Sequence, residues 1–197
     1  MTEAVSIRPG RASDVDALAR SIARAFGHLP VSHWLVPDDD DARIDAMAGQ
    51  FQLLVAQGID HGAVYVAGDG DGVAVWFPPG PMPDIADYDA RLAEACGPYT
   101  ARFVALDQEM HKAHPAEPDH AYLAFLTVNA GARNRGIGSA LLDRHHRRLD
   151  ADGTPAYLDA SGLQSRALYL RKGYADHAEP YGPDGVTGFY PMWREPR

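Results

Sequence analysis

Cysteine, long apolar runs and positive charge are all scarce in this sequence. Cys96 is the single cysteine among 197 residues, so no disulfide can form within the chain, which is typical of a reducing compartment. No apolar run approaches the length that spans a membrane, and residues 1–11 lack the apolar stretch of a signal peptide. We therefore expect a soluble, cytoplasmic protein.

The charge balance is acidic. Eighteen lysines and arginines stand against 27 aspartates and glutamates, which gives a net charge of −9. A surface of this sign repels phosphate groups, so it argues against nucleic acid or a membrane as a partner and mildly favours a cationic small molecule. The length fits one domain, residues 1–197, with room for an insertion.

The first 77 residues predict a strand, two helices and a hairpin. Apolar residues at helical spacing indicate a helix up to Phe26, and a second helix begins in the acidic run 38–41. The four acids of this run are consecutive, without the alternating ligand spacing of a calcium loop, so we interpret them as a helix cap. Two β-prone runs, 63–67 and 73–77, flank a glycine-rich turn and predict an antiparallel hairpin.

Residues 78–119 form a segment of different character. It opens with four prolines and a glycine within six residues and then predicts one or two helices. Because it is longer than a connection needs to be, we interpret it as an insertion that covers a site, although a contact in a homodimer would have the same pattern. His111, His114 and His120 cluster at its end, but their spacing is not that of a zinc site, so we expect no metal.

The most informative stretch runs from residue 122 to 142 and predicts a strand, a turn and a helix. Residues 122–128 are apolar, aromatic and β-branched, as in a buried strand. Gly136 and Gly138 then fall in the first turn of a helix, where backbone N–H groups lack partners within the helix. Glycine lets a phosphate approach these groups closely, and Arg133 and Arg135 add positive charge, so the turn could hold an anion.

Three phosphate-binding patterns compete for this turn. A Walker loop needs Gly-Lys-Ser/Thr, and no lysine is present here. A dinucleotide fingerprint would use Asp159 at the end of the next strand to bind ribose, but Leu141 occupies the position of its third glycine. The third pattern, Arg-x-x-Gly-x-Gly, matches Arg133, Gly136 and Gly138.

This third pattern resembles the coenzyme A pyrophosphate loop of the GNAT acetyltransferases. Downstream, residues 155–160 indicate a strand, and Leu168-Tyr169 with Gly173-Tyr174 resembles the Leu-Tyr-x-x-x-Gly-Phe signature of that family, in the same order and spacing. A final hairpin is predicted from residues 174–181 and 187–194. The order of elements is similar to the family's and closest to its puromycin N-acetyltransferase-like branch, which implies an α/β fold with a mixed sheet and helices on both faces.

The resemblance implies that acetyl-CoA is the co-substrate and that a primary amine of a small molecule attacks it directly in a ternary complex. The strand at residues 126–128 would hold the pantetheine arm through its backbone, and residues 134–139 would bind the pyrophosphate. The expected coenzyme-binding residues are Leu126, Thr127, Val128, Arg133, Asn134, Arg135, Gly136, Ile137, Gly138, Ser139 and Ser165. Gly162 and Ser165 depart from the family pattern. Many members have asparagine at the position of Gly162, and alanine or asparagine is usual at the position of Ser165.

The transfer needs an acid and a base. Tyr169 stands at the family position of the phenol that protonates the departing thiolate, and the reference pKa values of about 10 and about 8.5 allow this transfer. The alternative is a buried aromatic residue on a helix. An incoming ammonium must lose a proton, and among Glu109, His111, His114 and His120 we rank His120 and Glu109 first.

An aromatic wall for the acceptor is predicted from Trp34, Trp76 and Tyr122. His145 and His146 diverge on one helix and are expected at the surface. Two rival functions stay open: a non-catalytic acyl-CoA-binding sensor on the same fold, and a nicotinamide-dependent oxidoreductase. The sequence does not identify the acceptor.

Overall fold

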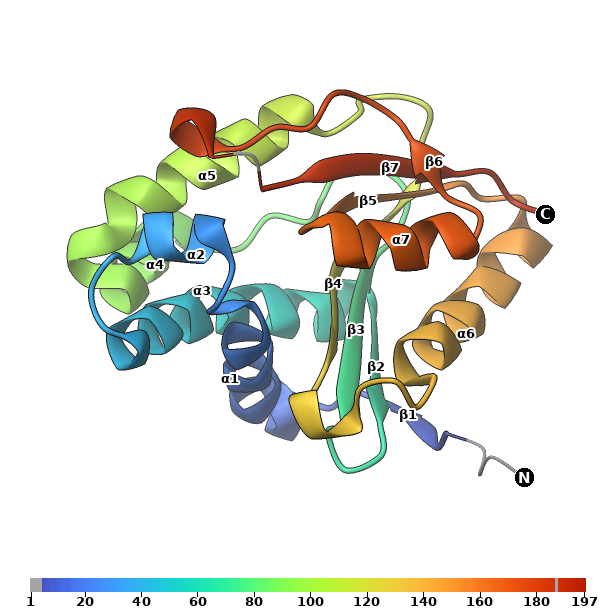
Figure 1. Ribbon diagram of the computed structural model, residues 1–197, viewed down its shortest axis with the longest axis horizontal. Helices are drawn as coiled ribbons and strands as arrows, with labels where there is room; N and C mark the ends of the chain where they lie inside the picture. Colours follow the sequence, from blue (N-terminus) through green and yellow to red (C-terminus); the bar gives the residue numbers. More distant parts are fainter. Residues whose placement is uncertain (1–4, 187) are drawn as a thin grey trace.

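A seven-stranded mixed sheet runs through the centre of the protein, with helices on both of its faces (Figure 1). The computed structural model describes residues 5–186 and 188–197. The strands are β1 (Ile7–Pro9), β2 (Ala63–Ala67), β3 (Gly72–Phe77), β4 (Ala121–Val128), β5 (Ala156–Ala160), β6 (Ala175–Asp176) and β7 (Tyr190–Arg194). Their order in the sheet is β1-β2-β3-β4-β5-β7-β6, and only β4 and β5 are parallel. The predicted α/β fold is therefore confirmed.

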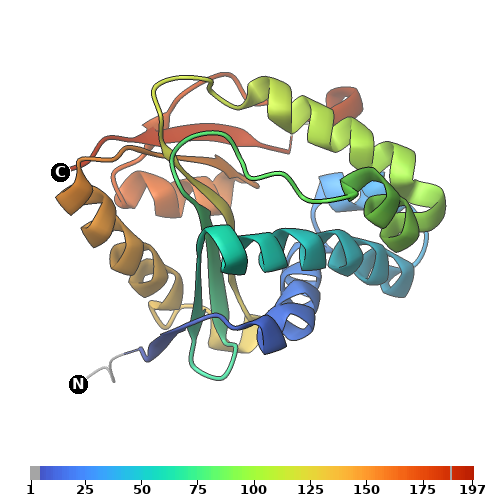
Figure 2. The same ribbon diagram turned by 180° about the vertical axis from the view of Figure 1, so that it is seen from behind.

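Two hydrophobic cores lie on the two faces of this sheet. The helices are α1 (Val15–Phe26), α2 (Pro30–Leu35), α3 (Asp40–His61), α4 (Tyr88–Cys96), α5 (Thr100–Ala113), α6 (Ile137–Asp152) and α7 (Leu163–Arg171). The first core joins the sheet to α1–α5, and the second joins it to α6 and α7. Figure 2 shows α3 crossing the face opposite to α6 and α7. We call these faces the α1–α5 side and the α6–α7 side.

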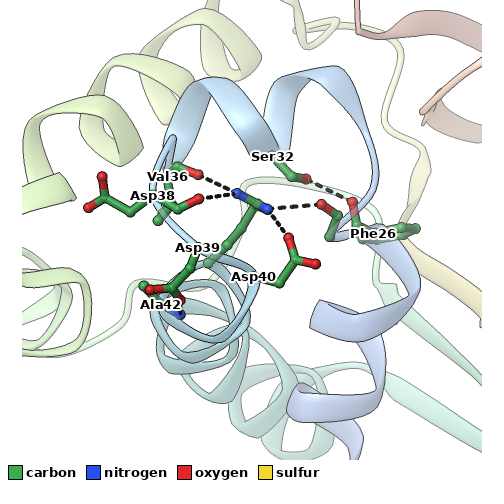
Figure 3. Close-up of polar contacts among 9 residues, drawn as sticks. Phe26, Ser32, Val36, Asp38, Asp39, Asp40 and Ala42 are labelled. Carbon is green, nitrogen blue, oxygen red and sulfur yellow. Dashed lines mark hydrogen bonds and ion pairs between the residues drawn. The ribbon is translucent and has the colours of Figure 1, made fainter.

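The predicted N-terminal helices are confirmed, and the acidic run caps α3 as expected. Asp39 accepts a hydrogen bond from the N–H of Ala42 at 2.8 Å (Figure 3). The segment between α1 and α3 contains the short helix α2, which the sequence did not indicate. The buried Arg43 fixes this corner, because its guanidinium donates to the carbonyls of Gly27 and Val36. This anchoring positions Trp34 on α2.

The insertion forms two helices, α4 and α5, which pack against α3 on the α1–α5 side. A polar contact joins all three helices: Asp107 on α5 accepts hydrogen bonds from the hydroxyl of Tyr88 at 2.7 Å and from the amide of Gln50 at 3.0 Å. Burial raises the pKa of Asp107, and these two hydrogen bonds oppose that rise. The insertion is therefore an integral part of the first core.

The C-terminal hairpin is shorter than predicted. β6 and β7 pair over two residues, and an isolated bridge joins Tyr181 to Phe189. Between them a 3-10 turn, η4, spans Pro183–Gly185, while Thr187 of the predicted hairpin lies outside the described residues. Across the described ranges, no helix has the length and apolar character needed to cross a membrane.

Candidate active site

The parallel strands β4 and β5 part in the middle of the sheet. Their pairing ends at Leu123 and Leu158, although β4 continues to Val128. At the same level β4 bulges, because Trp76 pairs with Leu123 and Val75 with Phe125, which leaves Ala124 as the extra residue. Bulges of this kind redirect a strand and are common next to active sites. Beyond Leu123, the β5-facing edge of β4 is therefore free to bind an extended ligand.

The turn after β4 exposes a row of backbone donors. The N–H groups of residues 134–139 donate to no acceptor in the described part of the chain, and the first helical bond is from Ala140 to Gly136 at 2.9 Å. Asn134 and Gly136 both have left-handed backbones, with φ of 63° and 78°. Such turns direct successive N–H groups into one concavity that suits an anion. The sequence prediction of Gly136 at the start of α6 is confirmed.

The two glycines of this turn leave room for a ligand. A Cβ at Gly136 would meet nothing within 4 Å, so the space above it is open. A Cβ at Gly138 would lie 3.6 Å from Val128 and 3.7 Å from Leu168, which shows that α7 approaches the start of α6. Arg133 and Arg135 are exposed beside the turn, and Arg135 lies 3.8 Å from Asp71.

The remaining predicted coenzyme residues are less distinctive. Leu126 and Val128 are half-buried in the second core, while Thr127 and Ile137 are buried. The hydroxyl of Ser165 donates to the carbonyl of Gly162 at 2.9 Å, which ties it to the start of α7. The structure thus brings the end of β4, the turn and α7 together around one opening.

Tyr169 lies on α7 in the second core, next to Leu168. Its side chain is buried, its ring packs edge-on against Tyr174 at 5.7 Å, and its hydroxyl hydrogen-bonds to no residue that the structure describes. Burial raises the pKa of this phenol, so it is protonated at neutral pH and can act only as a proton donor from its resting state. This geometry is compatible with Tyr169 as the predicted general acid. Its hydroxyl makes no hydrogen bond that would hold the described structure together.

His120 is buried, and both of its ring nitrogens are engaged. Nδ1 lies 2.8 Å from the carbonyl of Pro118, and Nε2 lies 3.0 Å from Nε2 of His114. A carbonyl can only accept, so His120 carries its proton on Nδ1, and the pair requires His114 to donate from Nε2. The basic nitrogen left over is Nδ1 of His114, whose pKa burial lowers to about 4.

Glu109, the other predicted base, is partly exposed on α5 and has no hydrogen bond or ion pair to a described residue. His111 is exposed. Within residues 5–186 and 188–197, no three histidine, cysteine or acidic side chains are grouped so that they could hold a metal ion. The structure therefore joins His114 to His120 by a hydrogen bond, whereas Glu109 has no such contact with either of them.

The predicted aromatic wall is wrong for one of its three members. Trp34 and Tyr122 both pack against the first core, but Trp76 belongs to the second core and is fully buried. Its indole stacks on His145 at 4.3 Å, so it lines no surface on the acceptor side.

The expectation that His145 and His146 lie at the surface is also wrong. Both are buried, because one face of α6 rests on Trp76 while the neighbouring face meets Tyr174. Nδ1 of His145 lies 3.1 Å from the hydroxyl of Tyr65, and Nε2 of His146 lies 3.0 Å from that of Tyr174. Burial lowers the pKa values of these histidines to about 3 and about 4.

Asp159, which the sequence suggests only as a ribose-binding acid, lies at the opening between β4 and β5. It follows directly after Leu158, the last residue of β5 that pairs with β4. Its Oδ1 accepts a hydrogen bond from the hydroxyl of Tyr157 at 2.8 Å, and burial raises its pKa to about 6. The sequence could have indicated this position, because Asp159 is a charged residue within the otherwise apolar strand β5.

Comparisons with known proteins agree with this geometry. A model described as "Acetyltransferase (GNAT) family" matches residues 85–174, which contain β4, the turn, α6, β5 and α7. An uncharacterized N-acetyltransferase of Schizosaccharomyces pombe is 25% identical over 178 residues, covering 83% of this chain and 71% of that protein.

Solved structures share the fold over nearly the full chain. A structure described as histone acetyltransferase HPA2 and related acetyltransferase from Corynebacterium glutamicum is 26% identical with a TM-score of 0.75, covering 99% of this chain and 98% of that one. Chaetomium thermophilum Naa20, in complex with a bisubstrate analogue, is 17% identical with a TM-score of 0.54, covering 98% and 87%. These likenesses do not test the puromycin N-acetyltransferase-like branch, which stays a prediction. Together, the family model, this relative and these structures support the GNAT acetyltransferase family for this chain.

Proposed function

We propose that this protein transfers the acetyl group of acetyl-CoA to a primary amine of a small molecule, by direct attack in a ternary complex. The observation that supports this most strongly is the row of unbonded N–H groups at residues 134–139, placed where β4 leaves β5. A diphosphate would satisfy these donors, and the start of α6 adds the positive end of a helix dipole. The likeness to this family favours acetyl transfer over the nicotinamide alternative.

The coenzyme would lie along the opening on the α6–α7 side. Its diphosphate would fit the open space above Gly136, where any Cβ would intrude. Its pantetheine arm would run along the edge of β4 at residues 126–128, as a substitute for the missing strand. A backbone N–H near the bulge at Ala124 could then polarise the thioester carbonyl.

Tyr169 would act as the general acid. The neutral amine attacks the thioester carbon, and the C–S bond breaks when the tetrahedral intermediate collapses. The departing thiolate takes the proton of the Tyr169 hydroxyl, and the second proton of the amine nitrogen returns through water to the phenolate. In sum, one ammonium and one thioester give one amide, one thiol and one proton.

The base remains a proposal, and the geometry favours the histidine pair over Glu109. His120 has no free nitrogen of its own, so a proton from the acceptor would enter at Nδ1 of His114, and the proton on its Nε2 would pass to His120. His114 packs edge-on against Tyr122 at 4.9 Å, a contact that supports a role beside the proposed acceptor wall. The helices of the insertion would close the acceptor side, and a homodimer contact there stays a prediction.

Turnover of the purified protein tests this function. Acetyl-CoA is mixed with a panel of primary amines, and the release of free coenzyme A is followed with a thiol reagent while calorimetry measures acetyl-CoA binding. We expect binding together with amine-dependent thiol release. Binding without release for every amine would favour the acyl-CoA-binding sensor, and the absence of binding would contradict both functions.

A further inference from the structure

The carboxylate of Asp159 lies where the two strands part, on the side away from the coenzyme turn. Ala156, Leu158 and Ala160 of β5 all belong to the second core, on the α6–α7 side. Because side chains alternate along a strand, Tyr157 and Asp159 face the α1–α5 side. A group bound at Asp159 would therefore meet the opening from the face opposite to α6 and α7, shown in Figure 2.

This carboxylate has no cationic partner. Asp159 forms no ion pair with a described residue, and its single hydrogen bond there is the one from Tyr157 to Oδ1. Burial disfavours the charged carboxylate and raises its pKa to about 6, although the neighbouring phenols Tyr157 and Tyr181 oppose that rise. By contrast, the partly buried Asp150 near the C-terminus is paired with Arg194 at 2.8 Å. Asp159 therefore lacks the cationic partner that Asp150 has.

Three tyrosines surround the carboxylate. Tyr122 and Tyr157 sit side by side on the paired strands, with ring centroids 6.0 Å apart and planes 29° apart. The hydroxyl of Tyr181 is buried and makes no hydrogen bond to a described residue. Burial raises the pKa values of all three phenols, and the nearby charge of Asp159 raises them further, as Asp107 also does for Tyr122.

A carboxylate among electron-rich rings suits a cation. A metal ion is a poor fit, because one carboxylate with neutral phenols does not supply the several charged oxygens that divalent cations take from proteins. A protonated amine fits better: its N–H groups can donate to Oδ2 of Asp159 and to the oxygen of Tyr181, while its carbon chain contacts the rings. Trp34 and Tyr122 extend this apolar surface along the first core.

We propose that Asp159, enclosed by Tyr122, Tyr157 and Tyr181, binds the ammonium group of the acceptor, and that the acceptor is a cationic alkylamine with an apolar substituent. This inference rests on the proposed acetyl transfer and adds the substrate class and its binding residue. An aliphatic amine is protonated at neutral pH, so the carboxylate of Asp159 attracts it. An arylamine is uncharged at that pH, so it is a poor acceptor. The binding itself involves no proton transfer.

Asp159→Asn tests the proposal with 2-phenylethylamine as the acceptor at pH 7.5. We expect its KM to rise at least tenfold, while the KM of acetyl-CoA changes less than twofold. Asp143→Asn is the control, because Asp143 is also a partly buried carboxylate, but it is paired with Lys172 at 2.7 Å on the α6–α7 side. This control should leave both KM values within twofold.

A second measurement uses only the wild-type protein and so does not depend on the folding of a variant. Calorimetry on the coenzyme A complex compares 2-phenylethylamine with 2-phenylethanol, its neutral analogue, and we expect the alcohol to bind at least tenfold more weakly. Equal binding of the two probes, or an unchanged amine KM in Asp159→Asn, would overturn the ammonium site while leaving acetyl transfer intact. Failure of the protein to bind acetyl-CoA would instead overturn the proposed function and this inference with it.

Discussion

The two sides of the candidate site are built from different parts of the chain. In the proposed site, the main chain on the α6–α7 side would supply the binding groups: the N–H row at residues 134–139 and the unpaired edge of β4. On the α1–α5 side the side chains of Trp34, Tyr122 and Asp159 would supply them, from α2, β4 and β5. Main-chain groups are the same in every protein of one fold, whereas side chains differ. The coenzyme side thus suits a shared co-substrate and the acceptor side an individual one.

The two tryptophans give the sharpest contrast between the sides. Trp76→Ala should lower the free energy of unfolding by about 3–5 kcal/mol, because it empties a fully buried site under α6. Trp34→Ala should have little effect on stability but should raise the acceptor KM. Urea unfolding and steady-state kinetics measure the two effects. A stable Trp76→Ala variant with a raised acceptor KM would restore Trp76 to the acceptor wall.

Tyr169→Phe tests the chemical step on the coenzyme side. We expect kcat to fall about 10²- to 10³-fold, since general acid catalysis contributes on that scale, while calorimetry shows unchanged binding of acetyl-CoA. Tyr174→Phe is the control: Tyr174 is also buried, but its hydroxyl is bonded to His146 at 3.0 Å. The control should lose stability and keep its kcat. An equal fall in both variants would show that Tyr169 only fills space.

Two of the buried histidines that make stability depend on pH lie on the α6–α7 side, and His114 on the other side adds an effect of the same sign. Burial lowers the pKa values of His145 and His146 to about 3 and about 4, below the ordinary value of about 6.5. Between those values the unfolded chain binds more protons, so the free energy of unfolding falls as the pH drops from 6.5 towards 4, by about 1–3 kcal/mol for each histidine. Urea unfolding at stepped pH measures this. His146→Gln should flatten the slope, and the exposed His33→Gln should not.

Gly136→Ala should produce the smallest effect and the most specific one. The φ of 78° disfavours any other residue by about 1–2 kcal/mol, and the new methyl group would project into the space assigned to the diphosphate. We expect the Kd of acetyl-CoA to rise about tenfold by calorimetry. Gly131→Ala in the same loop is the control, because its Cβ also meets nothing within 4 Å and it lacks a left-handed backbone. Equal binding by both variants would contradict the assignment of the turn.

The coenzyme side was predictable because its signals are local. Gly136 and Gly138 after an apolar run indicate the turn at once, and the structure has both at the start of α6. The burial of His145 and His146 could not be predicted, since adjacent helical residues diverge and the sequence alone indicates a surface position for both. The sequence does not show that the second face meets Tyr174 on the segment after α7.

Trp76 and Asp159 were missed for a different reason. All six residues of β3 are buried, so no alternation along that strand distinguishes one face from the other. The role of Asp159 depends on Tyr181, which approaches from the C-terminal hairpin through a single bridge to Phe189. Side-chain sites assembled from distant segments need the register of the sheet, which a single sequence does not supply.

A lone carboxylate without a cation has a consequence for turnover. Acetylation converts an ammonium into a neutral amide, so the reaction removes the charge that Asp159 would hold. The product then leaves a site that has lost its main attraction, and the next acceptor meets no strong competition from it. Under this scheme the acetylated amine is a weak inhibitor. Its weak binding favours release of the product over the reverse reaction.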